Sequence, residues 1–509
     1  MQLNKLQLEY KPVQLILPVN YEHVIDGCDP VVSFREVVGG LNLQRFIKTS
    51  RKGRQEYHPE VMLQLILFGY MENIRSLRQL EKACQVDIRF MYLGDGIRPS
   101  FMAFQRFIDS KLTDSIDDIF YMINQYLIKK DQIDTNILFV DGTKIEANAN
   151  KFTFVWKKAV LKYQAKLFVK ISETLEAIKE QLGYPANQKQ EYASFDLESL
   201  CSLLEEQIER EGVKFVYGKG TRKTPVQRHY EKVVGYQAKL KEYEEKLEIC
   251  GERNSYSKTD DDATFMHGKE DYYNKTGIFK PYYNLQIGVS DEYILHYGVF
   301  PNPTDTKTWI PFFDSFYQRY GFYPESPVGD AGYGSYDNYL YNLNHKMRLT
   351  MKYGMFSKEE EKAFKKKLYN IKNVTIEADR LITQDGHVYY YSHDYQKREG
   401  VYPQIKQVYV HEAWDESHKQ QKIPRTISRD IVLLQLQDEA KRELKNEEGI
   451  ELRVRRSIEA EGAFGDIKAN AEYTRIQRRG KRRVQTEICL VLIGYNLRKY
   501  HAKKHRLIH

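Results

Sequence analysis

Three acidic residues of this chain stand where folding can bring them to one place. Asp141 directly follows the apolar run 137–140, which has the pattern of a strand buried on both faces. Asp330 follows a second short strand that begins at Ser326, and Glu461 lies in a predicted late helix. Side chains at the carboxyl ends of strands in an α/β sheet line the crevice where ligands bind. A helix packed beside those strands can supply the third carboxylate.

Carboxylates gathered in this way can hold divalent cations. Hard cations such as Mg²⁺ are bound by a few carboxylates, water molecules and substrate phosphates rather than by a complete protein cage. Two such ions about 3.5–4 Å apart can activate a nucleophile and stabilise the leaving oxygen of an in-line phosphoryl displacement. The predicted chemistry is therefore metal-assisted phosphoryl transfer.

Each of the three acids also has a purely structural interpretation. Asp141 and Gly142 can form a two-residue hairpin turn, since Asp-Gly is favoured there. Asp330 can simply open a glycine-rich loop, and Glu461 can lie on a solvated helix face. Periodicity alone does not select these three over other nearby acids, which are Glu146, Asp337, Glu459 and Asp466. From the residues alone, the choice stays open.

The composition is that of a soluble globular protein. Of the 509 residues, 41% are hydrophobic and 29% are charged, which excludes a disordered or fibrous chain. No window approaches 18 uninterrupted apolar residues and the amino terminus has no signal core, so we expect a cytoplasmic protein without a membrane span. The five cysteines are scattered without a Cys-x-x-Cys pair, which argues against a zinc finger.

A basic excess is confined to the carboxyl-terminal end. The whole chain has a net charge of +8, whereas residues 475–509 contain eleven Lys and Arg residues and a single acid, Glu487. This segment therefore has a net charge of +10, and the remainder sums to −2. Such a local excess of positive charge is typical of a protein that binds a polyanion. A basic tail that is simply solvated is the alternative interpretation.

Short helices are predicted in the first 130 residues. Pro59 suits the first turn of a helix over 61–70, a second helix begins after Ser76, and a third covers 101–108. Short helices separated by tight turns suit a helix-turn-helix DNA-binding domain. An ordinary helical bundle fits the same pattern, and both interpretations stay open.

Strand and helix signals alternate over the rest of the chain, with two interruptions. Residues 155–254 have the periodicity of long amphipathic helices, with breaks near 183–186 and 218–223. Residues 355–450 are mixed, with a charged helix and β-like alternation. Further strands are predicted at 282–289 and 293–299, which form a hairpin, and at 347–352, 388–391 and 408–410. Further helices are predicted at 307–320, from 335, and at 358–367, 453–470 and 486–500.

Four ordered motifs carry a resemblance to a known family. They are the segments 139–151 (with Phe-Val-Asp-Gly-Thr-Lys), 257–266 (with Ser-Lys-Thr-Asp), 329–335 (Gly-Asp-Ala-Gly-Tyr-Gly-Ser) and 458–468 (with Glu-Gly-Ala-Phe-Gly-Asp-Ile-Lys). In these segments the chain resembles the DDE transposases of the IS1182 group of bacterial insertion sequences, which are related to the IS4 and IS5 groups. The resemblance implies an α/β fold with a ribonuclease-H-like catalytic core, an N-terminal helix-turn-helix-like domain, a long helical insertion and a second mixed insertion.

The expected domain boundaries follow from these motifs and the composition changes. An N-terminal helical DNA-binding domain (1–130) precedes the first core strand (131–154), the helical insertion (155–254), the core strands with the second Asp (255–354), the mixed α/β insertion (355–450), and the core helix with the third acid and the basic tail (451–509).

The resemblance also implies roles for particular residues. Asp141, Asp330 and Glu461 match the three catalytic, metal-binding acids of the family, and Glu461 is chosen over Glu459 by its Glu-x-x-Phe-Gly-x-x-Lys pattern. The implied cofactor is a pair of Mg²⁺ ions, with Mn²⁺ as an alternative. Many relatives carry a cysteine cluster in the second insertion, but residues 355–450 contain no cysteine. No zinc is therefore predicted there.

DNA contacts are expected from basic side chains. Lys468, seven residues after the third acid, is expected to hold a DNA phosphate near the cut. The family's Arg position holds Ser457 here, so that its role can fall to Arg456. Trp156 can stack on an unpaired base or pack in the core. The other expected DNA contacts are Arg98, Arg106, Lys219, Arg222, Lys223, Arg475, Arg478, Arg479, Lys481, Arg482 and Arg483.

The function implied is that of a bacterial insertion-sequence transposase. It would bind terminal inverted repeats and target DNA as a homodimer, hydrolyse the element end, and transfer the 3′-hydroxyl to target DNA in the nucleoid. Two alternatives remain. One is a structure-selective, ribonuclease-H-like DNA nuclease without strand transfer, and the other is a non-catalytic DNA-binding protein derived from a transposase.

Overall fold

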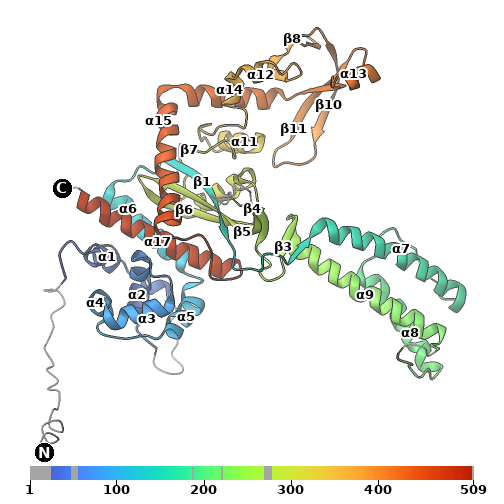
Figure 1. Ribbon diagram of the computed structural model, residues 1–509, viewed down its shortest axis with the longest axis horizontal. Helices are drawn as coiled ribbons and strands as arrows, with labels where there is room; N and C mark the ends of the chain where they lie inside the picture. Colours follow the sequence, from blue (N-terminus) through green and yellow to red (C-terminus); the bar gives the residue numbers. More distant parts are fainter. Residues whose placement is uncertain (1–24, 48–55, 186–187, 219–221, 269–277, 507–509) are drawn as a thin grey trace, which may run out of the picture. The chain divides into compact units, whose positions relative to one another are not determined.

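The computed structural model describes residues 25–47, 56–185, 188–218, 222–268 and 278–506 (Figure 1). Lys219, one of the expected DNA contacts, lies outside the described residues. The chain divides into two compact units, residues 1–133 with 488–509 and residues 134–487. The expected mixed α/β architecture is observed. Residues 488–509, which the sequence analysis groups with the third acid, here belong to the unit of the N-terminal helices.

The first unit is helical. Its helices are α1 (Pro30–Gly39), α2 (Pro59–Met71), α3 (Leu77–Val86), α4 (Ile88–Gly94), α5 (Phe101–Phe107), α6 (Ile116–Asp131) and the second part of α17 (Lys481–Arg506). The predicted helices at 61–70, after 76 and at 101–108 are confirmed, and α1, α4 and α6 are additional ones. Helix α2 is buried on nearly all sides, from Met62 to Met71, which makes it the centre of this unit's core. Gly494 of α17 lies against its backbone at Tyr70.

A mixed sheet forms the centre of the second unit. Its order is β4-β5-β1-β7, with β6 beside β5, for strands β1 (Ile137–Glu146), β4 (Thr264–His267), β5 (Phe279–Ser290), β6 (Tyr293–Phe300) and β7 (Ser326–Val328). Strand β1 is parallel to β7 and antiparallel to β5. The predicted hairpin is confirmed as β5 and β6, and its turn places Asp291 and Glu292 at positive φ. The strand predicted at 347–352 is reduced to a parallel bridge between Gly329 and Met351.

Strand β1 differs from its predicted form. It does not stop at Asp141 but continues to Glu146, paired with β5 throughout. The hairpin turn considered for Asp141 and Gly142 is therefore excluded. The polar sequence after Val140 looked like a strand end because its partner, β5, lies more than 130 residues further along the chain.

The first insertion consists of long helices, as predicted. They are α7 (Lys157–Leu182), α8 (Glu198–Arg210) and α9 (Pro225–Cys250), and the short strands β2 (Phe154–Trp156) and β3 (Ser255–Ser257) pair at their base. Helix α7 ends at Gly183 in the left-handed conformation that favours glycine. Helices α7 and α9 run side by side (Figure 1), and Ile171, Leu204 and Leu240 lie in their shared core.

The second insertion contains a sheet of its own. Its order is β12-β11-β10-β9-β8, for β8 (Thr375–Glu377), β9 (Arg380–Ile382), β10 (Val388–Lys397), β11 (Gln404–His411) and β12 (Thr426–Arg429), with the short helix α13 (Glu416–Gln420) before β12. The strand signals at 388–391 and 408–410 are confirmed. The single charged helix predicted at 358–367 is wrong, since only a 3₁₀ turn (Lys358–Glu360) and α12 (Lys362–Lys365) form, separated by Glu361 in an extended conformation. Phe364 is buried and Ala363 is exposed, and every other residue of this segment is charged, so packing contributes little to a longer helix.

The remaining helices flank the central sheet and the second insertion. They are α10 (Trp309–Tyr320), α11 (Tyr336–Asn344), α14 (Ile431–Lys445) and α15 (Glu447–Arg456). The predicted late helix begins earlier than expected, at Glu447, and its continuation alternates π-helical turns (Ser457–Glu461 and Asp466–Asn470) with α16 (Gly462–Gly465). Such π-helical turns are rare and are often found at functional sites.

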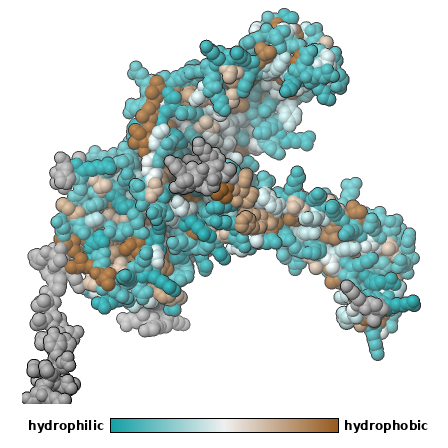
Figure 2. Space-filling model, viewed as in Figure 1, coloured by the Kyte–Doolittle hydropathy of each residue, from teal (hydrophilic) through white to brown (hydrophobic). Residues whose placement is uncertain are grey.

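Hydrophilic residues cover most of the face shown in Figure 2. Among the residues that the structure describes, no helix is both long enough and apolar enough to cross a bilayer.

Candidate active site

The pairing of β1 with β7 brings the first two acids together. The parallel register joins Phe139 to Val328, and each Asp lies two residues beyond its member of this pair. Because side chains alternate along a strand with a period of two, Asp141 and Asp330 leave neighbouring chain segments on the same side. Both contact one guanidinium: Nη2 of Arg456 lies 2.9 Å from Oδ1 of Asp141 and 4.0 Å from Oδ2 of Asp330.

The third acid reaches the same guanidinium from the late helix. Nη1 of Arg456 lies 3.5 Å from Oε1 of Glu461, the last residue of a π-helical turn. This turn is held against the sheet by apolar contacts, since Leu452 and Ala460 form one buried cluster with Phe139 and Val328. The residues that fix the strand register are therefore the residues on which the helix packs. The structure thus gathers all three predicted acids around a single positive charge.

The three carboxylates form a negatively charged cluster whose members differ in exposure. The side chain of Asp141 is 17% exposed, that of Asp330 43% and that of Glu461 60%, so the first acid lies deepest. Burial raises the pKa of Asp141, the charge of Arg456 opposes this rise, and the charges of Asp330 and Glu461 add to it. Arg456 is itself 11% exposed, and its Nε is buried without a hydrogen-bond partner. Three negative groups this close require a positive charge among them.

The competing acids of the sequence analysis all have other partners. Glu459 accepts hydrogen bonds from Arg455 and from the backbone N–H of Glu292 at the β5–β6 turn. Glu146 pairs with Lys280, Asp337 accepts the backbone N–H groups of residues 401 and 402, and Asp466 accepts from Asn470. Each of these contacts is structural, so the geometry separates Glu461 from its neighbours.

A fourth carboxylate, missed by the sequence analysis, borders the site. Oδ1 of Asp305 accepts hydrogen bonds from Asn284 (2.8 Å) and Gln286 (2.9 Å), two polar side chains buried in β5. A Cβ atom added to Gly142 would lie 2.9 Å from Oδ1 of Asp305, and one added to Gly332 would lie 3.6 Å from Oδ2. Asp305 therefore lies between the residue that follows Asp141 and the loop that follows Asp330. The signal in the sequence was the pair of amide side chains, Asn284 and Gln286, in the mainly apolar segment of β5, because such side chains need a polar partner when they are buried.

Replacement of Gly142 with Ala is expected to disturb this network. The new methyl group would lie 2.2 Å from Nε2 of Gln286. This amide donates hydrogen bonds to Asp305 and Asn284, so it cannot move away without losing them. We expect a loss of about 1–3 kcal/mol in the free energy of unfolding and a fall of about 10- to 100-fold in any reaction at the acids. Chemical denaturation and a cleavage assay measure the two effects.

The matched control is Gly235→Ala in α9, where an added Cβ meets nothing within 4 Å. This change is expected to leave the reaction intact and to stabilise the helix slightly. Equal behaviour of the two variants would contradict the tight packing at Gly142.

Lys468 lies against the strand that carries the first acid. Its Nζ donates hydrogen bonds to Oγ1 of Thr143 (2.5 Å) and to the carbonyl oxygen of Lys144 (3.0 Å). The two regular helical turns expected between Glu461 and Lys468 are instead α16 followed by a π-helical turn. The lysine nevertheless places its charge two residues beyond Asp141 on β1. Arg456, expected to contact DNA, lies within the acidic cluster in this structure.

The basic segment, residues 475–483, is anchored at several points. The backbone N–H of Glu146 donates to the carbonyl of Thr474, and that of Ile476 donates back to the carbonyl of Glu146. The carboxylate of Glu487 accepts the backbone N–H groups of residues 477 and 478. The side chains that remain exposed are Arg475, Arg479, Lys481, Arg482 and Arg483, whereas Arg478 is half-buried. The last helix, predicted from 486, already begins at Lys481, so three of these side chains stand in its first turn.

The other expected DNA contacts are scattered over the two units. Arg98 and Arg106 are exposed in the N-terminal unit, and Arg222 is exposed in the helical insertion. Lys223 of the same insertion pairs with Glu231 at 2.6 Å. Trp156 is 44% exposed, with its ring edge-to-face against Phe265, so it is not a fully buried core residue.

Comparison with protein families matches two segments of the chain. Residues 415–501 match the model described as a transposase DDE domain, and residues 19–110 match a transposase domain (DUF772). The first match contains Glu461, Lys468 and the basic segment but neither Asp141 nor Asp330. No match was found among curated proteins or among solved structures. Both matched segments are similar to transposase domains, and together they make up less than half of the chain.

Proposed function

We propose that this chain is the transposase of a bacterial insertion sequence, with Asp141, Asp330 and Glu461 as its catalytic acids. The observation that carries the proposal is the contact of all three carboxylates with the guanidinium of Arg456. They come from a central strand, the loop after a parallel neighbour, and a helix that packs on both strands. This mixed sheet also supports the ribonuclease-H-like core that the resemblance implies.

The donor set fits divalent magnesium or manganese. Carboxylate oxygens are the ligands that these hard cations take in proteins, and the guanidinium of Arg456 already contacts the three acids as a positive group. Asp141, Asp330 and Glu461 would hold the ions. When bound, the ions supply the positive charge that activates the attacking oxygen and stabilises the leaving one in phosphoryl transfer.

The residues around the acids have distinct tasks in this proposal. Burial keeps Asp141 rigid, because its carboxylate is fixed by the β1–β7 register and by Arg456. Lys468, hydrogen-bonded to β1, neutralises a DNA phosphate next to the scissile bond. The anchored basic segment follows the DNA backbone. Three of the basic side chains lie in the first turn of α17, where the positive end of the helix dipole also attracts phosphate groups.

DNA recognition is assigned to the N-terminal helices. The transposase domain match over residues 19–110 covers α1 to α5. In this proposal these helices bind the terminal inverted repeats, and a homodimer holds the two ends of the element. The reaction takes place on chromosomal DNA in the bacterial cytoplasm.

A cleavage and joining assay tests the proposed function. The purified chain is incubated with Mg²⁺ and a duplex that carries the DNA flanking its gene, including any inverted repeat. The expected products are a nick at the repeat boundary with a 3′-hydroxyl, followed by joining of this end to a target duplex. Cleavage without joining when a 3′-hydroxyl end is supplied would identify a nuclease. Binding without cleavage would identify a non-catalytic DNA-binding protein.

A further inference from the structure

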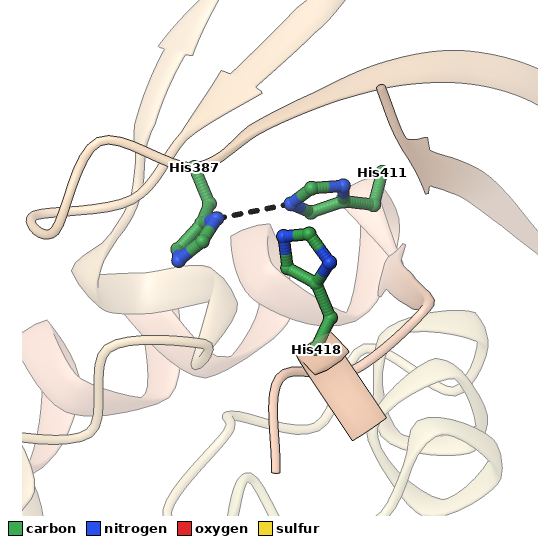
Figure 3. A group of neighbouring side chains, drawn as sticks. All are labelled: His387, His411 and His418. Atoms are coloured by element: carbon green, nitrogen blue, oxygen red, sulfur yellow. Dashed lines mark hydrogen bonds between the residues drawn. The ribbon is translucent and has the colours of Figure 1, made fainter. Parts of the chain in front are cut away.

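Three histidines of the second insertion gather at one end of its sheet. His387 precedes β10, His411 ends β11, and His418 lies in α13 (Figure 3). Nδ1 of His387 lies 3.0 Å from Nε2 of His411. One ring nitrogen from each of the three histidines lies within 4.8 Å of the other two. The three rings lie next to one another in Figure 3.

Two of the three rings are backed by carboxylates. Nδ1 of His418 lies 2.7 Å from Oδ1 of Asp415, which leaves its Nε2 to face the other rings. Nε2 of His387 lies 3.8 Å from Oδ2 of Asp385, a carboxylate that the hydroxyls of Tyr369 and Thr383 hold in place. Histidines that bind metals donate the N–H of their other nitrogen to a carboxylate or a carbonyl oxygen, which orients the ring. The contact of His418 with Asp415 has this form, whereas Asp385 lies near His387 beyond hydrogen-bond distance.

The third ring is held differently. Without an ion, the backbone N–H of Ala413 donates to Nδ1 of His411 at 3.1 Å, so its Nε2 carries the proton that lies toward His387. An ion takes the place of this proton, because imidazole binds metals through a deprotonated nitrogen. The proton then occupies Nδ1, and the hydrogen bond with Ala413 is given up for a metal–nitrogen bond.

We infer that His387, His411 and His418 form a binding site for a zinc ion, with a fourth position open to water. Imidazole suits borderline divalent metals, and three protein ligands with one water molecule are a common zinc environment. The prediction of no zinc in residues 355–450 considered cysteines alone, and these histidines replace that expectation. The inference is independent of the proposed function, since it concerns neither the acids nor DNA.

The ion would add a link between helix α13 and the sheet of the insertion. Helix α13 has five residues, too few to be stable by itself in water, and none of them is buried. A metal bound by His418 and by the β10–β11 pair would tie this helix to the sheet. We therefore expect the bound ion to stabilise this part of the insertion.

Zinc and cobalt titrations of the full-length chain test the inference. After treatment with a chelator, the protein is titrated with Zn²⁺ by calorimetry and with Co²⁺, whose visible absorption is strong in a four-coordinate nitrogen site. We expect one ion per chain at this site and a higher midpoint of thermal unfolding with Zn²⁺. Without a Co²⁺ absorption band of this kind in the wild type, the inference is wrong.

Substitutions assign the signal to the three histidines. His418→Ala is expected to weaken zinc binding at least about tenfold and to remove the thermal shift. Asp415→Asn, which keeps an oxygen for the start of α13 but removes the carboxylate, is expected to weaken binding about 10- to 100-fold. His393→Ala is the control, because His393 is exposed on the same strand β10 and lies outside the cluster. Unchanged binding in both His418→Ala and Asp415→Asn would overturn the assignment.

Discussion

Asp141→Asn is expected to lower the rate of element-end cleavage by at least about a thousandfold, which corresponds to about 4 kcal/mol of transition-state stabilisation. Asp141 is the deepest of the three acids and makes the shortest contact with Arg456. The amide keeps the size of the side chain but removes one negative charge and one oxygen ligand. A site that holds divalent ions through a few carboxylates cannot lose one of them without losing most of its affinity. Gel-based cleavage of labelled end DNA in Mg²⁺ measures the effect.

Matched variants separate catalysis from folding. Asp330→Asn and Glu461→Gln are expected to behave like Asp141→Asn, because all three acids contact the same guanidinium. Glu459→Gln is the control, since this neighbouring acid packs at the β5–β6 turn and not at the site. Circular dichroism and DNA binding of the catalytic variants should match the wild type. Cleavage by Asp141→Asn at the wild-type rate would refute the assignment of the site.

The second large effect is expected in DNA binding. Simultaneous replacement of Arg475, Lys481 and Arg483 with Ala removes three exposed charges from the basic segment. If each of them neutralises one phosphate, the slope of log K against log salt concentration falls by about 2–3, and the affinity falls about 10- to 1000-fold at moderate salt. The loss should be similar for any DNA sequence, because contacts to phosphates carry no sequence information. Fluorescence anisotropy at several salt concentrations measures both quantities.

The control removes the same charge from another exposed surface. Lys362, Lys365 and Lys366 are exposed in and beside α12 of the second insertion. Their replacement with Ala is expected to leave the salt slope unchanged. Equal losses in the two triple variants would mean that net charge, and not the position of the basic segment, governs binding.

Local sequence signals were sufficient for most helices and for the hairpin. Pro59 and Gly183 mark a helix start and a helix end within one turn, and the polar residues 290–292 connect β5 with β6. Such signals act between neighbours, so they are visible in the sequence. Local signals gave the wrong strand end where the pairing partner is distant in the sequence. The prediction ended β1 at Asp141, whereas the strand continues because β5 pairs with it.

The choice among the acids depended on contacts far apart in the chain. From the residues alone, Glu459 and Glu461 were equivalent, and only the resemblance selected one of them. In the structure, a single apolar cluster holds the late helix on β1 and β7, which turns Glu461 toward Arg456 and Glu459 toward the β5–β6 turn. Asp305 joined the site for the same reason, through two amides of β5.

The sequence by itself determined the helical insertion, the β-rich character of the second insertion, the basic segment and the acids that can do chemistry. Only the tertiary structure decided which acids meet, and that His387, His411 and His418 face one another. Propensities and periodicity act over a few residues, whereas the positions of these side chains follow from strand register and from burial of apolar residues hundreds of positions apart.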